Sequence, residues 1–230
     1  MENTLALPQA EVERRSFIVQ VYHWMTAGLA FTGLIAWWVS SQPQLVHAII
    51  GNRALFWILI IAEFGLVLAL AGWVQRMSPL MAAAAFLGYA ALNGLTLSVI
   101  FLIYTSASIA TAFFVTAGTF GAASMYGYFT KTDLTSVGNF CFMGLIGVIL
   151  ASVVNFWFKS PAVYWVTTYA GVIIFVGLTA YDTQKIEGLF RGDESAGEER
   201  KEAIAGALAL YLDFINLFLD LLRIMGRRRD

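Results

Sequence analysis

The sequence predicts an all-α integral membrane protein, a bundle of seven helices. Two observations support this fold class. Of the 230 residues, 59% are hydrophobic and only 13% are charged, which is more apolar surface than a water-facing fold of this size buries. The charged residues separate apolar runs of about 20 residues, the length that a helix needs to cross a hydrocarbon core of about 30 Å.

Seven apolar runs account for most of the chain. Each run is continuous rather than alternating and is about twice as long as a transmembrane strand, so we expect helices and not a barrel. Proline and charged residues break the pattern between the runs. The predicted spans are Phe17 to Val39, Ala54 to Gln75, Leu80 to Tyr104, Ile109 to Phe129, Val137 to Phe158, Ala162 to Asp182 and Ala203 to Leu222.

The chain is predicted to form one membrane domain, residues 17–230, after a polar N-terminal segment, residues 1–16. The first apolar run is too long for the core of a signal peptide. It ends in Trp37 and Trp38, as an interfacial anchor does, so we expect the first helix to be retained. The only sizeable polar connection, residues 183–202, is expected to be a solvated loop with helical extensions at both ends.

The distribution of basic residues leaves the crossing of the last run open. If the N-terminus faces the cytoplasm and all seven runs cross, eight Lys and Arg lie inside and six outside, which is almost no bias. If the last run enters and returns, the basic tail joins the inside set and the count becomes twelve against two. This run has Asp213, Asn216 and Asp220 on one helical face, so it should not face lipid. We therefore place it at the centre, surrounded by the other six helices.

Function is sought among the ionisable side chains inside the spans, because a charge in the bilayer needs a partner, a proton or water. The candidates are Glu63, Asp182, Asp213 and Asp220, and no Lys or Arg lies deep in a span to neutralise them. Antiparallel packing of the sixth and seventh helices would bring Asp182 and Asp213 to similar depth. Two close carboxyls in a low dielectric do not both ionise cheaply and would share one proton over some pH range.

Each carboxyl also has a structural interpretation. Asp182 and Asp213 can cap or hydrogen-bond helix ends, although we favour function there. For Asp220 we favour an ion pair with Arg223, three residues further on. Glu63 is interpreted either as a neutral acid hydrogen-bonded to a neighbouring helix or as part of a polar pathway. The possible polar pathway comprises Glu63, Asn93, Asn216 and Asp220.

Small and amide side chains within the spans predict contacts between helices. Closely spaced small residues predict helix contact surfaces, and the asparagines predict interhelical hydrogen bonds. His23 and His47 lie near spans without Cys or clustered carboxylates, so we expect no metal site at either. The small residues are Gly28 with Thr32, Gly118 with Gly121 and Gly144 with Gly147, and the asparagines are Asn93, Asn139 and Asn155.

Two stretches of the sixth and seventh runs form a paired motif. The first is GLTAYDTQ at residues 177–184, the second is LYLDFINLF at residues 210–218, and NGLT at residues 93–96 accompanies them. With its size and span count, nearly the whole chain resembles the Bax inhibitor-1 family of bacterial and organellar membrane proteins. The resemblance implies two layers of three helices around a central seventh helix that crosses fully. It also implies a calcium-permeable, pH-sensitive leak in which Asp182 and Asp213 form a hydrogen-bonded pair.

The chain departs from the family pattern at two positions. Some members carry a basic residue in the second helix that engages the aspartate pair, whereas Glu63 is the only ionisable group within that span here. A cationic latch of that kind is therefore not expected. Asp220 lies outside the motif, so no role is transferred to it. No calcium-loop spacing is present, which fits weak, transient calcium binding at Asp182 and Asp213 better than a tight site.

The predicted function is a pH-sensitive calcium (cation) leak channel, gated by a proton-sharing pair of Asp182 and Asp213. The alternative is a non-transporting membrane regulator that binds a membrane-bound ATP-dependent protease, as the resemblance to bacterial members also implies. The expected partners are the lipid bilayer and calcium as the permeant ion, with no cofactor. A net charge near zero argues against a nucleic-acid partner.

The sequence does not predict an enzyme. Tyr181 and Asp182 resemble the first motif of intramembrane aspartyl proteases, but the residues before Asp213 lack the glycines of the second motif. The patterns HExxH and GxSxG and a phosphate-binding glycine loop are also absent from the sequence. Without a transit sequence or a retention tail, and with the resemblance to bacterial members, we expect a multi-pass protein of a bacterial inner (plasma) membrane.

Overall fold

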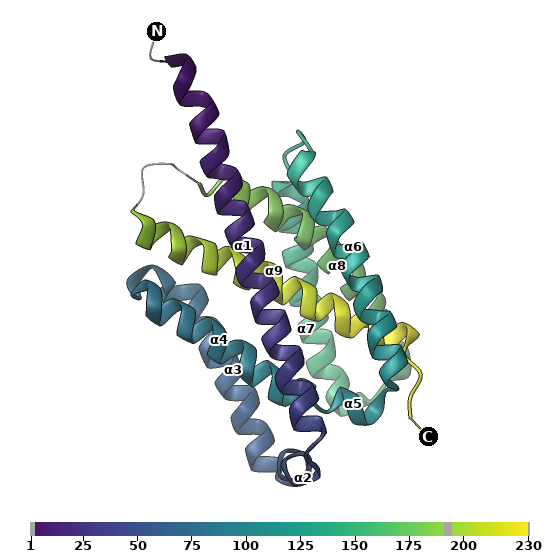
Figure 1. Ribbon diagram of the computed structural model, residues 1–230. Coiled ribbons are helices and arrows are strands. Elements are labelled where there is room, and N and C mark those ends of the chain that lie inside the picture. Colours follow the sequence, from purple (N-terminus) through teal and green to yellow (C-terminus); the bar gives the residue numbers. More distant parts are fainter. Residues whose placement is uncertain (1–2, 191–194, 230) are drawn as a thin grey trace. The chain divides into compact units, whose positions relative to one another are not determined.

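A computed structural model describes residues 3–190 and 195–229 of the chain. Apart from one isolated bridge between Tyr104 and Arg228, the regular structure of these residues is helical (Figure 1). Within the same residues, seven helices are long and apolar enough to cross a membrane. The predicted all-α membrane class is therefore confirmed.

The seven long helices fall close to the predicted spans. Of the shorter helical segments, one lies in the connection after the first span, one at the end of the second span and one at the end of the third. The long helices are α1 (Asn3–Ser40), α3 (Arg53–Trp73), α4 (Pro79–Leu97), α6 (Ser106–Phe129), α7 (Thr135–Phe158), α8 (Pro161–Glu187) and α9 (Ala196–Met225). The short ones are α2 (Pro43–Gly51), the 3₁₀ turn η1 (Val74–Arg76) and α5 (Ile100–Ile103).

The structure differs from the predicted boundaries at two places. Residues 3–16, expected as a separate polar segment, continue the helix of the first span. The expected third span is divided into α4 and α5, and at the break the Ser98 hydroxyl donates to the carbonyl of Leu95 (2.6 Å). The polar connection has the expected helical extensions, since α8 continues to Glu187 and α9 begins at Ala196. Its residues Arg191, Asp193 and Glu194 lie outside the described residues.

The helices group into two compact units, and α9 contributes to both. Unit 1 contains α1 to α5 and the first half of α9, up to Tyr211. Unit 2 contains α6 to α8 and the second half of α9, from Leu212. Each unit thus has three spanning helices of its own.

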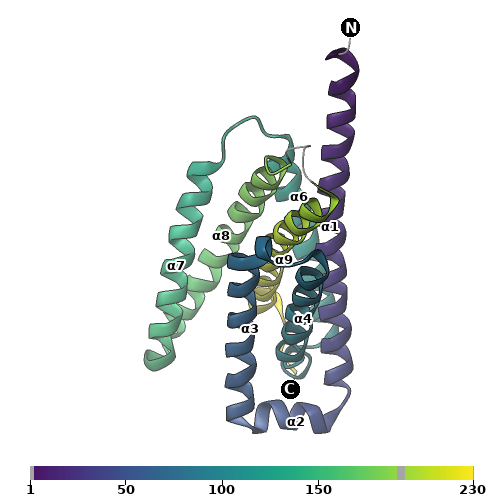
Figure 2. The same cartoon turned by 90° about the vertical axis from the view of Figure 1, so that its left-hand side faces the viewer.

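In unit 1, α4 packs between α1 and α3. Figure 2 shows α2 lying across the ends of α1 and α3. Pro43 opens α2 at a position where no backbone donor is needed. The Asn52 side chain accepts from the N–H groups of Ala54 and Leu55 and so caps α3, and Ser78 caps α4 in the same way. These local caps set the lengths of the hairpins.

In unit 2, α6 and α7 both pack against α8. The α7–α8 hairpin is closed by Asn155, whose amide oxygen accepts from the N–H of Ser160 (2.7 Å) and whose NH₂ donates to the Ser160 carbonyl (3.1 Å). Lys159 takes a left-handed conformation (φ 50°) at the end of α7. Asn155 therefore closes a turn, and its predicted role as an interhelical hydrogen bond is wrong.

The α6–α7 connection is held by Gln184 of α8 and by Asp133. The Gln184 side chain accepts from the N–H of Leu134 (2.8 Å) and donates to the carbonyl of Thr132 (2.9 Å). The side chain of Thr135 and its backbone N–H (2.8 Å) both hydrogen-bond to the Asp133 carboxylate. These two hydrogen bonds hold the pKa of Asp133 below its usual value. The resulting stabilisation is complete above the unfolded-state pKa and is lost as the pH falls through the folded-state value.

Helix α9 is the most shielded of the seven spanning helices. In its most apolar window 67% of the residues are buried, against 33% or less in each of the other six. Asp213 and Asp220 are among the buried residues, as expected for a polar face that avoids lipid. The central position of α9, with α8 and α3 as its neighbours, stays a prediction.

We expect the connection between α8 and α9 and the C-terminal tail to lie on opposite sides of the membrane. Helix α9 is unbroken over 30 residues, about 45 Å at 1.5 Å per residue, which suffices for a full crossing. Topology reporters fused at Asp193 and at Asp230, both outside the described residues, should therefore report opposite compartments. The same compartment at both sites would mean that the last segment enters and returns.

Candidate functional site

Asp182 and Asp213, the predicted pair, lie near each other within unit 2. Asp182 is near the end of α8 and is partly buried, whereas Asp213 is in α9 and is only 4% exposed. The charge of Asp182 acts on the Asp213 carboxyl, and the ammonium of Lys185 acts on Asp182. The two aspartates that the motif names thus interact electrostatically, and their role as a proton-sharing pair stays a prediction.

The Asp213 carboxyl is incompletely satisfied. Its Oδ2 atom is buried and has no hydrogen-bond partner in the part of the chain that the structure describes. A buried carboxylate without a partner is costly, so this oxygen needs a proton, a cation or water.

Ser124 of α6 is a second buried polar group in unit 2 without a partner among the described residues. It lies one turn beyond Phe120, on the same face of α6. The Phe120 ring packs against Phe214, the residue that follows Asp213 (centroids 5.4 Å apart). Sequence reasoning missed Ser124, because nothing in a single span shows which serine faces another helix.

The motif around Asp182 is positioned by glycines on the facing helices. Any Cβ at Gly127 of α6 would overlap the backbone of Ala180, and one at Gly138 of α7 would overlap the ring of Tyr181. The backbones can approach this closely only because these residues lack a side chain. Asp182, next to Tyr181, is therefore presented by a tightly packed stretch of α8.

The predicted glycine contacts are only partly correct. Gly144 packs on Ile174, and Gly28 packs on Phe86. An added Cβ at Gly118, Gly121 or Gly147 would meet nothing within 4 Å in the described part of the chain, so their predicted role as contact surfaces is wrong there. Spacing along one helix does not show which face meets protein.

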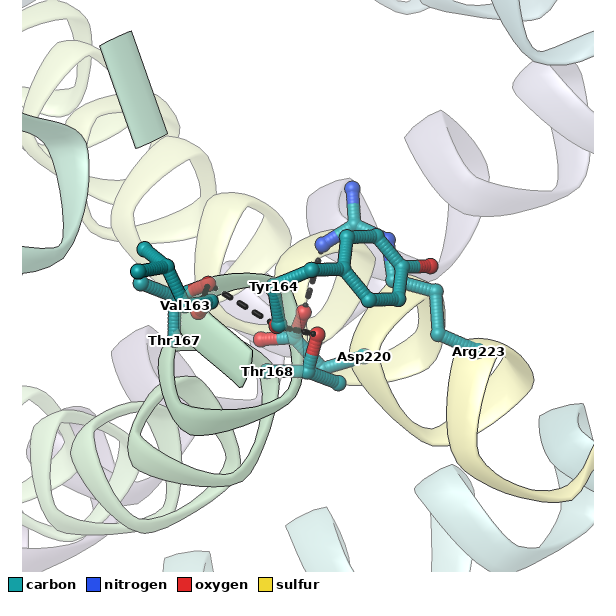
Figure 3. A network of polar contacts seen from close by, with 6 residues as sticks. All are labelled: Val163, Tyr164, Thr167, Thr168, Asp220 and Arg223. Carbon is teal, nitrogen blue, oxygen red and sulfur yellow. Dashed lines mark hydrogen bonds and ion pairs between the residues drawn. The ribbon is translucent and has the colours of Figure 1, made fainter. Parts of the chain in front are cut away.

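Asp220 forms the predicted ion pair with Arg223 (Figure 3). The Arg223 guanidinium donates to Asp220 Oδ1 at 2.8 Å, and it lies 6.0 Å from the centre of the Tyr164 ring of α8. The other oxygen of Asp220 lies over Gly171, where a Cβ would overlap it. Because Gly171 of α8 has no side chain, the buried Asp220 carboxylate of α9 can lie against the α8 backbone.

Glu63 makes the predicted hydrogen bond to a neighbouring helix. The Thr96 hydroxyl of α4 lies 2.7 Å from Glu63 Oε1 and also 3.0 Å from the carbonyl of Asn93. A hydroxyl has one hydrogen, so it donates to only one of these acceptors at a time. When it donates to Asn93, a protonated Glu63 can donate to the Thr96 oxygen.

A hydroxyl chain in unit 1 joins α9 to α1 and α4. Thr32 Oγ1 donates to the Ala90 carbonyl (2.8 Å) and lies 2.7 Å from the Tyr211 hydroxyl. Because a carbonyl only accepts, the Thr32 hydrogen is committed to Ala90, and Tyr211 must donate to Thr32. Tyr211 and Thr32 are both fully or almost fully buried. Tyr211 lies in the second motif, but its partner is 179 residues away and was not predicted.

The remaining members of the possible polar pathway bond within their own helices. Asn93 is hydrogen-bonded to Tyr89 on α4, and Asn216 donates to the carbonyl of Leu212 on α9 (2.8 Å). Glu63 and Asn93 belong to unit 1, and Asn216 and Asp220 belong to unit 2. The described residues contain no group of three or more His, Cys, Asp or Glu side chains that could hold a metal ion.

Comparison with known proteins shows the family. A family model described as "Inhibitor of apoptosis-promoting Bax1" matches residues 14–230. The chain belongs to the Bax inhibitor-1 family. It is 50% identical to the inner membrane protein YbhL of Escherichia coli over 229 residues, which is 99% of this chain and 97% of YbhL. The family predicted from residues 177–184 and 210–218 is therefore confirmed.

Other members of the Bax inhibitor-1 family match over similar lengths. The protein YrjE of Lactococcus lactis is 34% identical over 98% of this chain and 96% of its own length. A membrane protein of Streptococcus pyogenes is 33% identical over 99% of each chain. The chain is a multi-pass protein of a bacterial inner membrane, and its family is one of membrane proteins rather than a known group of enzymes.

Replacing Tyr211 with Phe should destabilise this family member only slightly. The substitution removes one hydrogen bond but leaves Thr32 donating to Ala90. Hydrogen bonds in membrane proteins contribute about 0.6 kcal/mol on average, so we expect a loss near that value in unfolding titrations in mixed micelles. Tyr169→Phe is the control, because Tyr169 is exposed. A loss of several kcal/mol would mean that the hydroxyl chain is more than a local contact.

Gly171→Ala should destabilise unit 2 by about 1 to 3 kcal/mol, the usual cost of overpacking. The new methyl group would occupy the place of an Asp220 oxygen and displace the carboxylate from α8. Gly147→Ala is the matched control, because nothing described lies within 4 Å of its added Cβ. Melting temperatures in detergent measure both variants. Equal melting temperatures would show that Asp220 does not need the space over Gly171.

Proposed function

We propose that the protein is a pH-sensitive calcium (cation) leak channel gated by a proton that Asp182 and Asp213 share. One observation carries the proposal: Asp213 has a buried carboxyl oxygen without a hydrogen-bond partner in the described residues, close to a second carboxyl. Family membership and the multi-pass fold are compatible with transport. The chemistry of the pair supplies the mechanism.

The pair has two charge states with different requirements. With one proton, the pair carries a single negative charge, and a short movement lets one carboxyl donate to the other. This form is favoured at low pH and is lost as the pH rises. With no proton, two negative charges face each other in a poorly solvated place. They must then separate or accept a cation.

Calcium suits the doubly ionised pair, because it is divalent and prefers oxygen ligands. Calcium usually takes six to eight oxygens, and two aspartates supply at most four. Water would fill the remaining positions. Such incomplete coordination predicts weak and transient binding, which a permeation site needs so that the ion can leave.

Movement follows from the placement of the pair. Asp182 is fixed in α8 by the close packing of Tyr181 on Gly138 and by the Gln184 hydrogen bonds. Repulsion between the carboxylates would therefore act mainly on α9. A change of proton occupancy thus becomes a displacement of α9 relative to α8.

The purified protein in calcium-dye-loaded liposomes tests this proposal across a pH series. Asp182→Asn and Asp213→Asn should each flatten the pH dependence of calcium flux, because an amide does not exchange the shared proton. Asp220→Asn is the matched control and should leave the profile largely intact, since Asp220 is paired with Arg223 instead. The direction of the wild-type profile shows which charge state conducts.

Two results would overturn the proposal. A wild-type pH profile in both motif variants would exclude the paired carboxyls as the gate. No calcium flux in wild-type liposomes, together with a stable complex with a membrane-bound ATP-dependent protease, would favour the non-transporting regulator. Proteoliposomes and co-purification from the native membrane distinguish these outcomes.

A further inference from the structure

The C-terminal tail after α9 is fastened to the start of α6. The Arg227 N–H donates to Ser108 Oγ (2.9 Å), and the Arg227 carbonyl accepts from the N–H of Thr105 (3.1 Å). Arg228 forms the antiparallel bridge with Tyr104. Gly226 lies against the Tyr104 ring, so close that a Cβ would overlap it. The backbone of the tail is thus hydrogen-bonded to the start of α6, whereas the arginine side chains of the tail are exposed.

The tail presents positive charge that no described acidic residue neutralises. The side chains of Arg227, Arg228 and Arg229 are exposed, and none forms an ion pair within the described residues. Arg229 uses one N–H group on the carbonyl of Phe101 (2.8 Å), which leaves its other donors. Arg223 differs, because its guanidinium is already paired with Asp220 (Figure 3).

Apart from Asp230, which lies outside the described residues, the connections expected on the tail's side of the membrane contain no acidic residue. The segment that holds it, residues 104–108, is YTSAS. With seven crossings, the connections after the first, third and fifth spans share a side with the tail. These connections contain no Asp or Glu and begin or end near the basic residues Arg53 and Lys159. This side of the protein is therefore basic, with Asp230 as the only acid outside a span.

The location of the arginines at the end of a spanning helix indicates which kind of anion they bind. Arg227 follows the last helical residue of a spanning helix, Met225, by two positions, so it lies where the span leaves the hydrocarbon. Met225 is itself 40% exposed and offers an apolar surface beside the charge. Arginine presents a planar set of donors that matches phosphate oxygens. Phosphate at this depth, beside acyl chains, belongs to a phospholipid.

We propose that Arg227, Arg228 and Arg229 bind the phosphate groups of anionic phospholipids. The lipid holds the end of α9 at the membrane surface, and the tail backbone holds the arginines at the start of α6. Basic residues next to a span are attracted to anionic headgroups, and salt screens the attraction. The inference requires only that α9 spans the membrane, and it is independent of any ion flux.

Native mass spectrometry of the detergent-purified protein tests this site with phosphatidylglycerol and with phosphatidylcholine. Wild type should bind phosphatidylglycerol more tightly than phosphatidylcholine. This preference should fall about fivefold for each arginine replaced by glutamine. The triple variant Arg227→Gln, Arg228→Gln, Arg229→Gln should lose it almost entirely. The control triple Arg76→Gln, Lys131→Gln, Arg200→Gln changes the net charge equally, at exposed positions in η1, in the α6–α7 connection and in the first turns of α9, and should keep the preference.

Two further measurements complete the test. Phosphatidylglycerol should raise the melting temperature of wild type but not of the tail variant, and the single variant Arg228→Gln serves if the triple variant does not fold. Inorganic phosphate at millimolar concentration should not displace the lipid. Displacement would identify a site for free phosphate and overturn the proposal. An undiminished lipid preference in the folded tail variant would overturn it too.

Discussion

The structure depends on one constraint: a polar side chain inside a bilayer must find its partner within the protein, because hydrocarbon offers none. The four carboxyls of the spans meet this constraint in different ways. Glu63 uses the Thr96 hydroxyl, Asp220 uses the Arg223 guanidinium, and Asp182 lies near the end of its helix within reach of the Lys185 charge. Asp213 retains a buried oxygen without a partner in the described residues. The chemistry of the protein is expected where this constraint is met least completely.

Close helix approach is the second half of the same constraint. Polar partners reach each other only where the backbones come near, and in unit 2 glycines permit this. Gly127 and Gly138 admit the α8 backbone and Tyr181, and Gly171 admits the Asp220 carboxylate. At Gly118 and Gly147, by contrast, an added Cβ would meet no described atom within 4 Å. A glycine is therefore informative only once its neighbour is known.

The difference between local properties of the sequence and contacts between helices explains how much of the molecule could be predicted from its sequence. The spans were predictable because length and hydropathy are local properties, and the Asp220–Arg223 pair was predictable because its members lie three residues apart. The break after Leu97 was missed, because no proline or charged residue marks it. The Tyr211–Thr32 bond and the packing around Asp182 were missed, since they depend on which helices adjoin. For the candidate site, the motif contained both aspartates and Gln184, but it did not show the hydrogen bonds of Gln184 or include Ser124.

Helix α9 combines three kinds of attachment within ten residues, and they respond differently to protons. At Tyr211 a chain of neutral hydroxyls ends on a backbone carbonyl, so its partners do not change charge near neutral pH. At Asp220 the carboxylate is paired with Arg223 of the same helix and packs over Gly171 of α8. At Asp213, between these two points, the nearby ionisable partner is another carboxyl, so in the proposed gate the interaction would change from attraction to repulsion when the shared proton leaves. In the proposed gate, a change in proton occupancy would therefore act on the segment of α9 between the Tyr211 contact with Thr32 and the Asp220 contact with Gly171. The proposed gate requires this arrangement, because a helix free at both ends would shift without directing the movement to one place.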